Sequence, residues 1–259
     1  LSLIYLIPGK TEEKREIAAP LIIETIQQPK QNVLKPVLQL QAVIAKAPKI
    51  RHLDKRAYID FPVNKIELRA DYRRNPAQLD SIITTINALK ADKNLQVMGI
   101  NIHGFASPEG SYKHNEYLAK NRAITLTEYV RKMVDLPDSI FIVSSTAEDW
   151  DGLCEYIKSS NLEKKEQLLA IAQDEKLAPD ARDAKLKQQY PTQYRTLLTL
   201  YYPALRHSDY HITYKIKPFD VEEAKEIMKT KPQQLSLNEL FMVAQTYEVG
   251  SKEFNKVME

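Results

Sequence analysis

The sequence has little of several residue types that mark particular protein classes. Its 259 residues include a single cysteine, Cys154, so no disulfide forms within the chain. Only 6 glycines occur against 14 tyrosines, which favours regular elements over long flexible loops. The net charge is +3, too small to indicate a nucleic-acid-binding protein. No apolar run reaches the roughly 18 residues of a membrane-spanning helix, so we expect no transmembrane segment.

Groupings of residues that carry catalytic or metal chemistry are also missing. The histidines are scattered along the chain, and none has the spacing of zinc ligands. Cys154 has no nucleophile motif around it and no identified base. We therefore predict a protein that is not an enzyme and that holds no metal or other cofactor.

The composition that is present is that of an ordinary globular protein, with 43% hydrophobic and 27% charged residues. We expect residues 1–50 to be a lead-in or the remnant of an upstream domain, 51–219 to form the main domain, and 220–259 to be helical. The chain begins with Leu1 rather than Met. We expect a mature or truncated product, so the missing signal peptide is uninformative.

Periodicity in the sequence predicts the elements of the main domain. Alternation with period 2 predicts strands at 57–68, 95–104, 139–145 and 208–218. A helix is expected to begin at Asn75, with Asn75 as its cap and Pro76 in its first turn. Between the third and fourth strands, at about 148–206, we expect a helical insertion.

The most informative stretch runs from Ile100 to Tyr129. An alternating strand is followed by a loop that contains Pro108 and Gly110. From Lys113 the apolar residues recur at helical spacing. The stretch therefore reads as a strand, a sharp loop and an amphipathic helix.

The stretch carries a spaced pattern made of Gly104, Gly110, Asn115, Leu118, Ala119, Arg122 and Ala123. With this pattern it resembles the OmpA-like C-terminal domain family, the peptidoglycan-associating module of Gram-negative envelopes. The resemblance covers about 57–145 and 208–217. It implies an α/β fold, an α+β sandwich of β-α-β-α-β order, with helices on one face of a mixed four-stranded sheet and the insertion before the last strand.

The resemblance also implies a ligand site. In the family, an aspartate after the strand and the helix arginine grip the two charged ends of a diaminopimelate residue in the stem peptide. Here Arg122 is present, but Ser107 stands at the aspartate position. The implied ligand-binding residues are Arg122, Ser107, Asn115, Glu109 and Gly104. We expect low affinity, and we expect Ser107→Asp to raise it.

Each of these residues also has a structural interpretation. Arg122 could form a surface ion pair with Glu109 or Asp149. Glu109 could be solvated or cap the helix, and Asn115 could hold the loop through side-chain to backbone hydrogen bonds.

Two functions remain open at this stage. One is a non-catalytic envelope module, periplasmic and outer-membrane associated, which binds peptidoglycan stem peptide and tethers the outer membrane or an outer-membrane assembly to the wall. The other is a protein–protein interaction or assembly module on the same fold with a degenerate pocket. In both, we expect envelope protein partners and no nucleic acid.

The C-terminal segment offers a second, shorter resemblance. The sequence LNELFMVAQTYEVGSKEFNKVME at 237–259 is similar to a tetratricopeptide-type helix pair. One copy does not make a solenoid, since about three repeats are needed for a stable one. The alternatives are the start of a longer array and a helical cap on the sheet.

Overall fold

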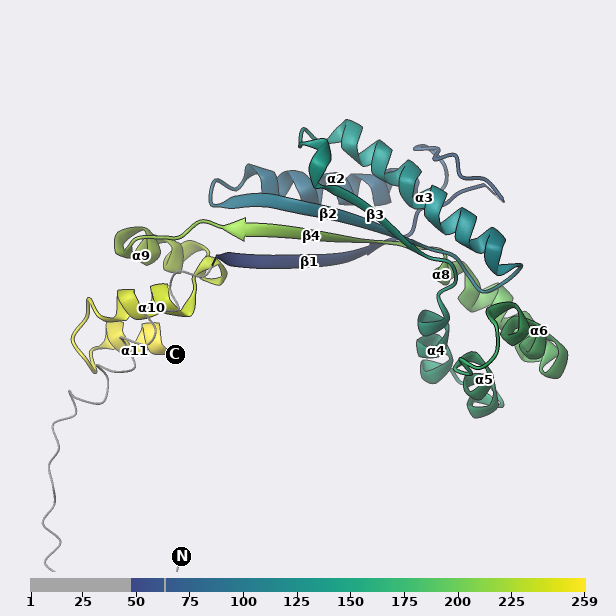
Figure 1. Cartoon of the computed structure of the whole chain (residues 1–259). Helices are drawn as coiled ribbons and strands as arrows, with labels where there is room; N and C mark the ends of the chain where they lie inside the picture. The colour runs from purple at the N-terminus through teal and green to yellow at the C-terminus, as the bar shows by residue number, and fades with distance from the viewer. Residues whose placement is uncertain (1–47, 63) are drawn as a thin grey trace, which may run out of the picture. The chain divides into compact units, whose positions relative to one another are not determined.

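The computed structural model describes residues 48–62 and 64–259 (Figure 1). The predicted lead-in, 1–50, lies almost wholly outside the described residues. The elements below all belong to one compact unit of the chain. No helix in the described ranges is both long enough and apolar enough to span a bilayer.

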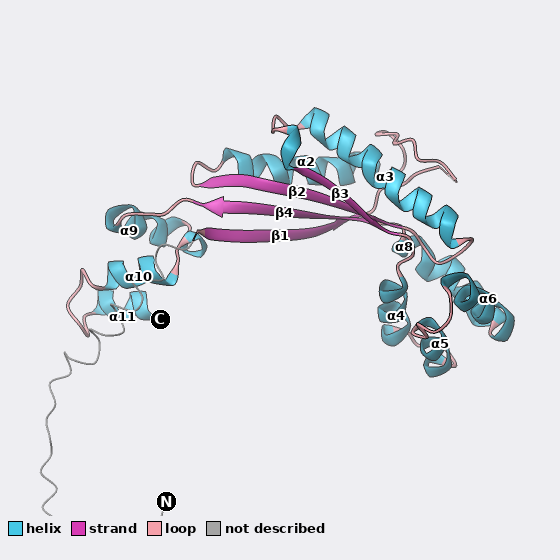
Figure 2. Ribbon diagram, in the orientation of Figure 1, coloured by secondary structure: helices cyan, strands magenta, loops and turns pink. Residues whose placement is uncertain are grey.

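The described chain contains a mixed four-stranded sheet (Figure 2). Its strands are β1 (Lys49–Ala57), β2 (Leu95–Phe105), β3 (Phe141–Thr146) and β4 (Ser208–Ile216), in the order β1-β4-β2-β3. β2 and β3 are parallel, whereas β4 is antiparallel to both β1 and β2. The predicted fold class, with a mixed sheet and an insertion before its last strand, is confirmed.

Two long helices, α2 (Asn75–Ala91) and α3 (Tyr112–Met133), lie on one face of this sheet (Figure 2). Ile100, Ile102 and Ile212 are fully buried and share one core with Ile86 and Leu126 on the helices. Burying a side chain of this size stabilises the fold by about 1.5–3 kcal/mol. The apolar faces that the period-2 strand pattern and the period-3.6 helix pattern predict therefore pack against each other in one core.

The predicted position of the first strand is wrong. The strand is Lys49–Ala57, and most of the segment predicted as a strand, from residue 58 onward, is an irregular loop that leads to α2. Pro62 has no N–H to donate to a ladder, and Asn64 has a left-handed φ of 56°. β1 and β2 run in the same direction, as a β-α-β order predicts, but β4 lies between them.

Asn75 does not cap α2 as the sequence predicts. It is the first helical residue and is fully buried. Its Oδ1 accepts a hydrogen bond from the Asp60 backbone N–H at 2.7 Å, and its Nδ2 donates to the Asp60 and Arg69 carbonyls at 2.9 and 2.7 Å. Asn75 thus fixes the loop to the start of the helix. Pro76 does take the first turn.

The insertion is helical, as predicted, and has its own apolar core. It comprises α4 (Trp150–Ser159), α5 (Lys165–Ala172), α6 (Pro179–Gln189), α7 (Pro191–Thr196), a π-helical turn (Leu197–Tyr201) and α8 (Tyr202–Leu205). Asp149 caps α4 by accepting a hydrogen bond from the Gly152 N–H at 2.9 Å. Leu153, Leu186 and Tyr202 lie in the insertion core.

The C-terminal helices are α9 (Val221–Thr230), α10 (Leu237–Ala244) and α11 (Lys252–Met258). Short 3-10 turns, Asp138–Ile140 and Pro232–Gln234, precede β3 and α10. The C-terminal helices share a third core with Ile216 and Phe219. They therefore pack where β4 ends, and a tetratricopeptide-like array beyond them stays a prediction.

Candidate functional site

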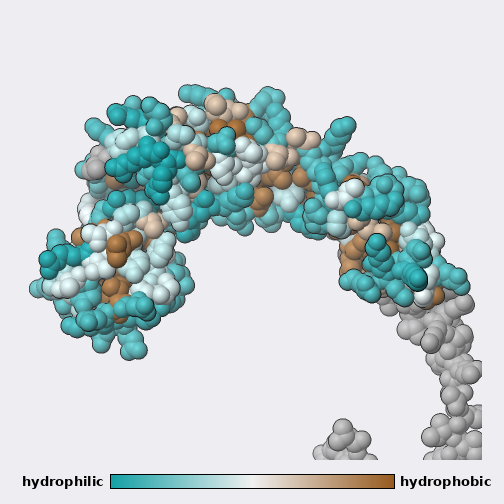
Figure 3. All heavy atoms as spheres, turned by 180° about the vertical axis from the view of Figure 1, so that it is seen from behind, coloured by the Kyte–Doolittle hydropathy of each residue, from teal (hydrophilic) through white to brown (hydrophobic). Residues whose placement is uncertain are grey.

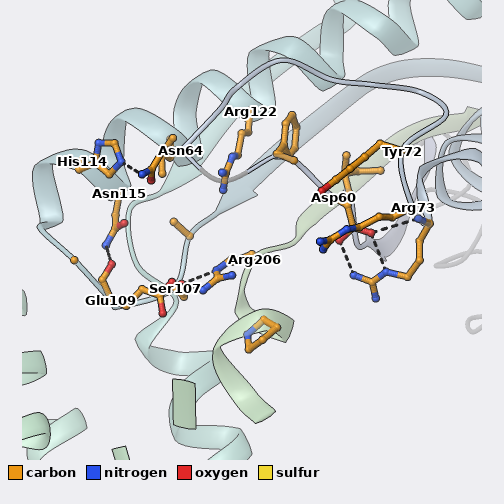
Figure 4. A pocket seen from close by; sticks show the side chains of 17 residues that line it. Asp60, Asn64, Tyr72, Arg73, Ser107, Glu109, His114, Asn115, Arg122 and Arg206 are labelled. Carbon is orange, nitrogen blue, oxygen red and sulfur yellow. Dashed lines mark hydrogen bonds and ion pairs between the residues drawn. The ribbon is translucent and has the colours of Figure 1, made fainter. Parts of the chain in front are cut away.

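A cavity of about 440 Å³ lies at the end of β2, beside the start of α3 (Figure 4). Three segments far apart in the sequence line it: the loop after β1, the loop between β2 and α3 together with the first turns of α3, and the end of the insertion. The polar residues among its walls are Asp60, Asn64, Tyr72, Arg73, Arg74, Ser107, Glu109, His114, Asn115, Arg122 and Arg206. Four of the five predicted site residues are in this group.

Arg122 extends from α3 toward this cavity (Figure 4). Its Nε donates to the Lys65 carbonyl at 3.1 Å, and its guanidinium lies 5.1 Å from the centre of the Phe61 ring. Within the described residues it forms no ion pair, so neither predicted pair, with Glu109 or with Asp149, exists. Burial and the nearby charge of Arg206 lower its pKa to about 10, so Arg122 is protonated at neutral pH.

Ser107 is hydrogen-bonded to an arginine from the end of the insertion. Its buried hydroxyl accepts a hydrogen bond from the Arg206 Nε at 3.0 Å. The same guanidinium forms an ion pair with the Glu109 carboxylate. Glu109 is therefore neither freely solvated nor a helix cap, and α3 is capped by Ser111 instead. The serine at the implied aspartate position is therefore bonded to a positively charged guanidinium, that of Arg206.

Asn115 holds the loop, as its structural interpretation predicts. It is buried, and its Nδ2 donates to the Glu109 backbone carbonyl at 3.0 Å and to Glu148 Oε1 at 2.9 Å. Glu148 also accepts from the Trp150 indole at 2.8 Å, and burial raises its pKa. Asn115 thus connects the loop between β2 and α3 to the start of the insertion, although it also lines the cavity.

Gly104 lies outside the walls of the large cavity. A Cβ on it would be 2.4 Å from the Ala119 carbonyl oxygen and 3.0 Å from the Ala123 Cβ. Glycine therefore permits α3, the helix that carries Arg122, to lie directly on β2. Gly104 and Arg122 do share the lining of a small neighbouring void of about 10 Å³.

Sequence reasoning missed the wall formed by the loop after β1. Asp60 there accepts two hydrogen bonds from Arg74, from Nε and Nη2, both at 3.0 Å. These bonds hold the pKa of Asp60 below its usual range. Asn64 Oδ1 lies 3.3 Å from the His114 ring nitrogen, which joins the loop to α3. No sequence motif identified this loop, because its residues alternate as a strand does.

Sequence reasoning also missed Arg206, which follows α8 and lies 99 positions after Ser107. With it, the cavity walls carry four arginines against two carboxylates, Asp60 and Glu109. Both carboxylates are already paired with arginines. The arrangement is chemically that of an anion-binding site.

No family model matches the chain, and no curated protein matches it. Among solved structures, the chain is similar to the periplasmic domain of Helicobacter pylori MotB, residues 97–256. The identity is 13%, the match covers 71% of this chain and 94% of that one, and the TM-score is 0.31. A likeness of this degree does not extend to function.

Proposed function

We propose that this chain is a non-catalytic cell-envelope module that associates with the stem peptide of peptidoglycan. One observation carries the proposal: the protonated Arg122 reaches the cavity, and no carboxylate of the described chain neutralises it. A ligand carboxylate would supply the missing partner. A charge-assisted pair of this kind is worth about 1.5–3 kcal/mol.

The dimensions of the cavity suit a peptide end. Its volume of about 440 Å³ falls in the range of small-ligand sites, roughly 300–1,000 Å³. Phe61 and Leu118 supply apolar wall, while Arg122 and Arg206 supply donors. The resemblance of the α3 motif to a peptidoglycan-associating family points to the same class of ligand. A periplasmic, outer-membrane-associated location and a tethering role belong to this proposal.

The second candidate is an assembly module on the same fold. It is favoured by Ser107, which stands at the position of the family aspartate and is hydrogen-bonded by Arg206, so the acidic half of the usual amino-acid pocket is missing. The face in Figure 3 is mostly hydrophilic, with apolar residues in small separate groups. That face offers no extended apolar interface, so it gives this candidate no further support.

Peptidoglycan pull-down decides between the two candidates. Arg122→Ala is expected to weaken retention at least about tenfold, which corresponds to about 1.4 kcal/mol. The matched control is Arg131→Ala, on the same helix but exposed and paired with Asp138, and it should bind like the wild type. Thermal melting of both variants checks that they fold. Equal binding by all three proteins, or binding by none, would leave the assembly module as the better description.

A further inference from the structure

We infer that the cavity recognises its ligand through the ligand's anionic groups alone, with Arg122 and Arg206 as a two-guanidinium clamp and, among the described residues, no unpaired acid for an ammonium group. The ligand class is a peptide end that presents carboxylates, and a second carboxylate adds to affinity. This inference rests on the proposed function and refines it.

The first step concerns the two carboxylates that line the cavity. Asp60 is held by two hydrogen bonds from Arg74, and Glu109 by an ion pair with Arg206. A ligand ammonium would have to compete with the two-bond Arg74 fork for Asp60, and it would have to share the Glu109 carboxylate with Arg206. Each acid is thus already neutralised by an arginine, which leaves little negative charge to attract an ammonium group.

The second step concerns the next carboxylate along the wall. Glu148 is buried, with its two oxygens accepting from the Asn115 amide and the Trp150 indole at 2.9 and 2.8 Å. Asn115 lines the cavity, whereas Glu148 does not. An ammonium group in the cavity therefore meets no open anion on this side either.

The third step concerns the donors that remain open. Arg122 uses only Nε within the described chain, which leaves both of its terminal nitrogens. Arg206 uses Nε and Nη2, which leaves Nη1. The two side chains line the same cavity, and the charge of Arg206 lowers the pKa of Arg122. An anion between the two guanidiniums would relieve that repulsion.

This arrangement changes what Ser107→Asp is expected to do. The Ser107 hydroxyl already accepts from Arg206, so a carboxylate at that position would pair with the same guanidinium. The new carboxylate would compete with Glu109 for Arg206 and would occupy the Arg206 N–H donors that the ligand needs. Affinity for an anionic end should then fall, rather than rise as the sequence alone suggests.

The test uses a diaminopimelate-ended peptide in three forms: unmodified, acetylated on its free amino group, and amidated on its terminal carboxyl groups. Calorimetry on the whole chain is expected to give Kd values within threefold for the first two. The amidated form should bind at least tenfold more weakly. A tenfold loss on acetylation, with Arg122-dependent pull-down intact, would overturn the inference and leave the proposed function standing.

Arg206→Ala tests the clamp through a change in ligand preference, which would not be expected if Arg206 had only a structural role. It frees Glu109, so the variant should prefer the unmodified peptide over the acetylated one, reversing the indifference of the wild type. Melting temperature shows whether the variant folds, and if it does not, the wild-type series decides alone. Binding of no peptide, together with pull-down that ignores Arg122→Ala, would overturn the proposed function and the inference together.

Discussion

Gly104 shows how one residue sets the geometry of the site. The backbone of α3 passes so close that a Cβ would lie 2.4 Å from the Ala119 carbonyl oxygen. Gly104→Ala forces the helix away from β2, and overpacking of this kind costs about 1–3 kcal/mol. Melting should show this loss. Gly99→Ala is the control on the same strand, because its nearest neighbour is the Ile140 carbonyl at 3.9 Å. Equal melting temperatures for both variants would contradict the close-contact explanation.

At this scale the sequence predicted four of the eleven polar residues that line the cavity. Ser107, Glu109, Asn115 and Arg122 meet because they lie within 16 positions on one strand-loop-helix unit, whose local geometry a short motif determines. Arg206 could not be found that way. Its contact with Ser107 depends on how the whole insertion folds back, which no local pattern encodes.

At the scale of elements, one buried ion pair attaches the C-terminal helices to the sheet. Lys49 of β1 donates to both oxygens of Glu239 of α10 at 2.8 and 2.9 Å, and the Phe219 and Ser236 backbone N–H groups donate to the same carboxylate at 2.7 Å. Both side chains are less than a tenth exposed. Lys49→Met leaves the buried Glu239 carboxylate without its ion-pair partner, and breaking such a pair lowers the free energy of unfolding by about 3–5 kcal/mol.

Chemical denaturation measures this loss as a drop in the free energy of unfolding. The control is Lys225→Met, which removes an exposed pair with Glu222 one helical turn away and should cost less than about 0.5 kcal/mol. If Lys49→Met costs no more than the control, the attachment of α10 rests on apolar packing alone.

The elements that the sequence predicted best are those with one buried face and one solvent-exposed face. β2, β4 and α3 each alternate at the period of their own structure, because the core takes one face. β1 fails this rule. Its sequence, KIRHLDKRA, is mostly exposed, since the strand lies at the edge of the sheet with β4 as its one partner in the described residues. Charged edge strands of this kind discourage pairing with other chains but leave no hydrophobic signature.

At the scale of the whole unit that contains the sheet, a buried histidine joins the insertion to the sheet. The His207 ring is inaccessible to solvent, with Nδ1 3.9 Å from Asp149 and Nε2 3.5 Å from Asp209. The Arg56 Nε of β1 donates to the same Asp209 oxygen at 2.7 Å, and the Phe105 ring stacks on the imidazole with its centre 4.3 Å away. Burial lowers the pKa of His207. The imidazole is therefore neutral in the folded protein at neutral pH.

Stability is expected to fall as the pH drops below about 6.5. The unfolded histidine takes up a proton there, at its ordinary pKa of about 6.5, while the folded one does not. The loss approaches about 1.4 kcal/mol for each further pH unit until the folded pKa is reached. Burial raises the pKa of Asp149, which acts in the opposite sense, so the comparison with His207→Gln carries the test. The variant should lose less stability than the wild type between pH 7.5 and 5.5, and identical slopes would assign the effect to other groups.

The place of Arg206 in the chain has a consequence for how this protein could diversify. It follows the last helix of the insertion and stands two residues before β4 begins. A shorter homologue that joined β3 directly to β4 would lose the insertion and this arginine in one event, and Glu109 would become free to hold a positive charge. Chain length and ligand preference would then be inherited as a single trait. Grafting the insertion, with its final arginine, onto a shorter relative should also transfer the preference for anionic ligands.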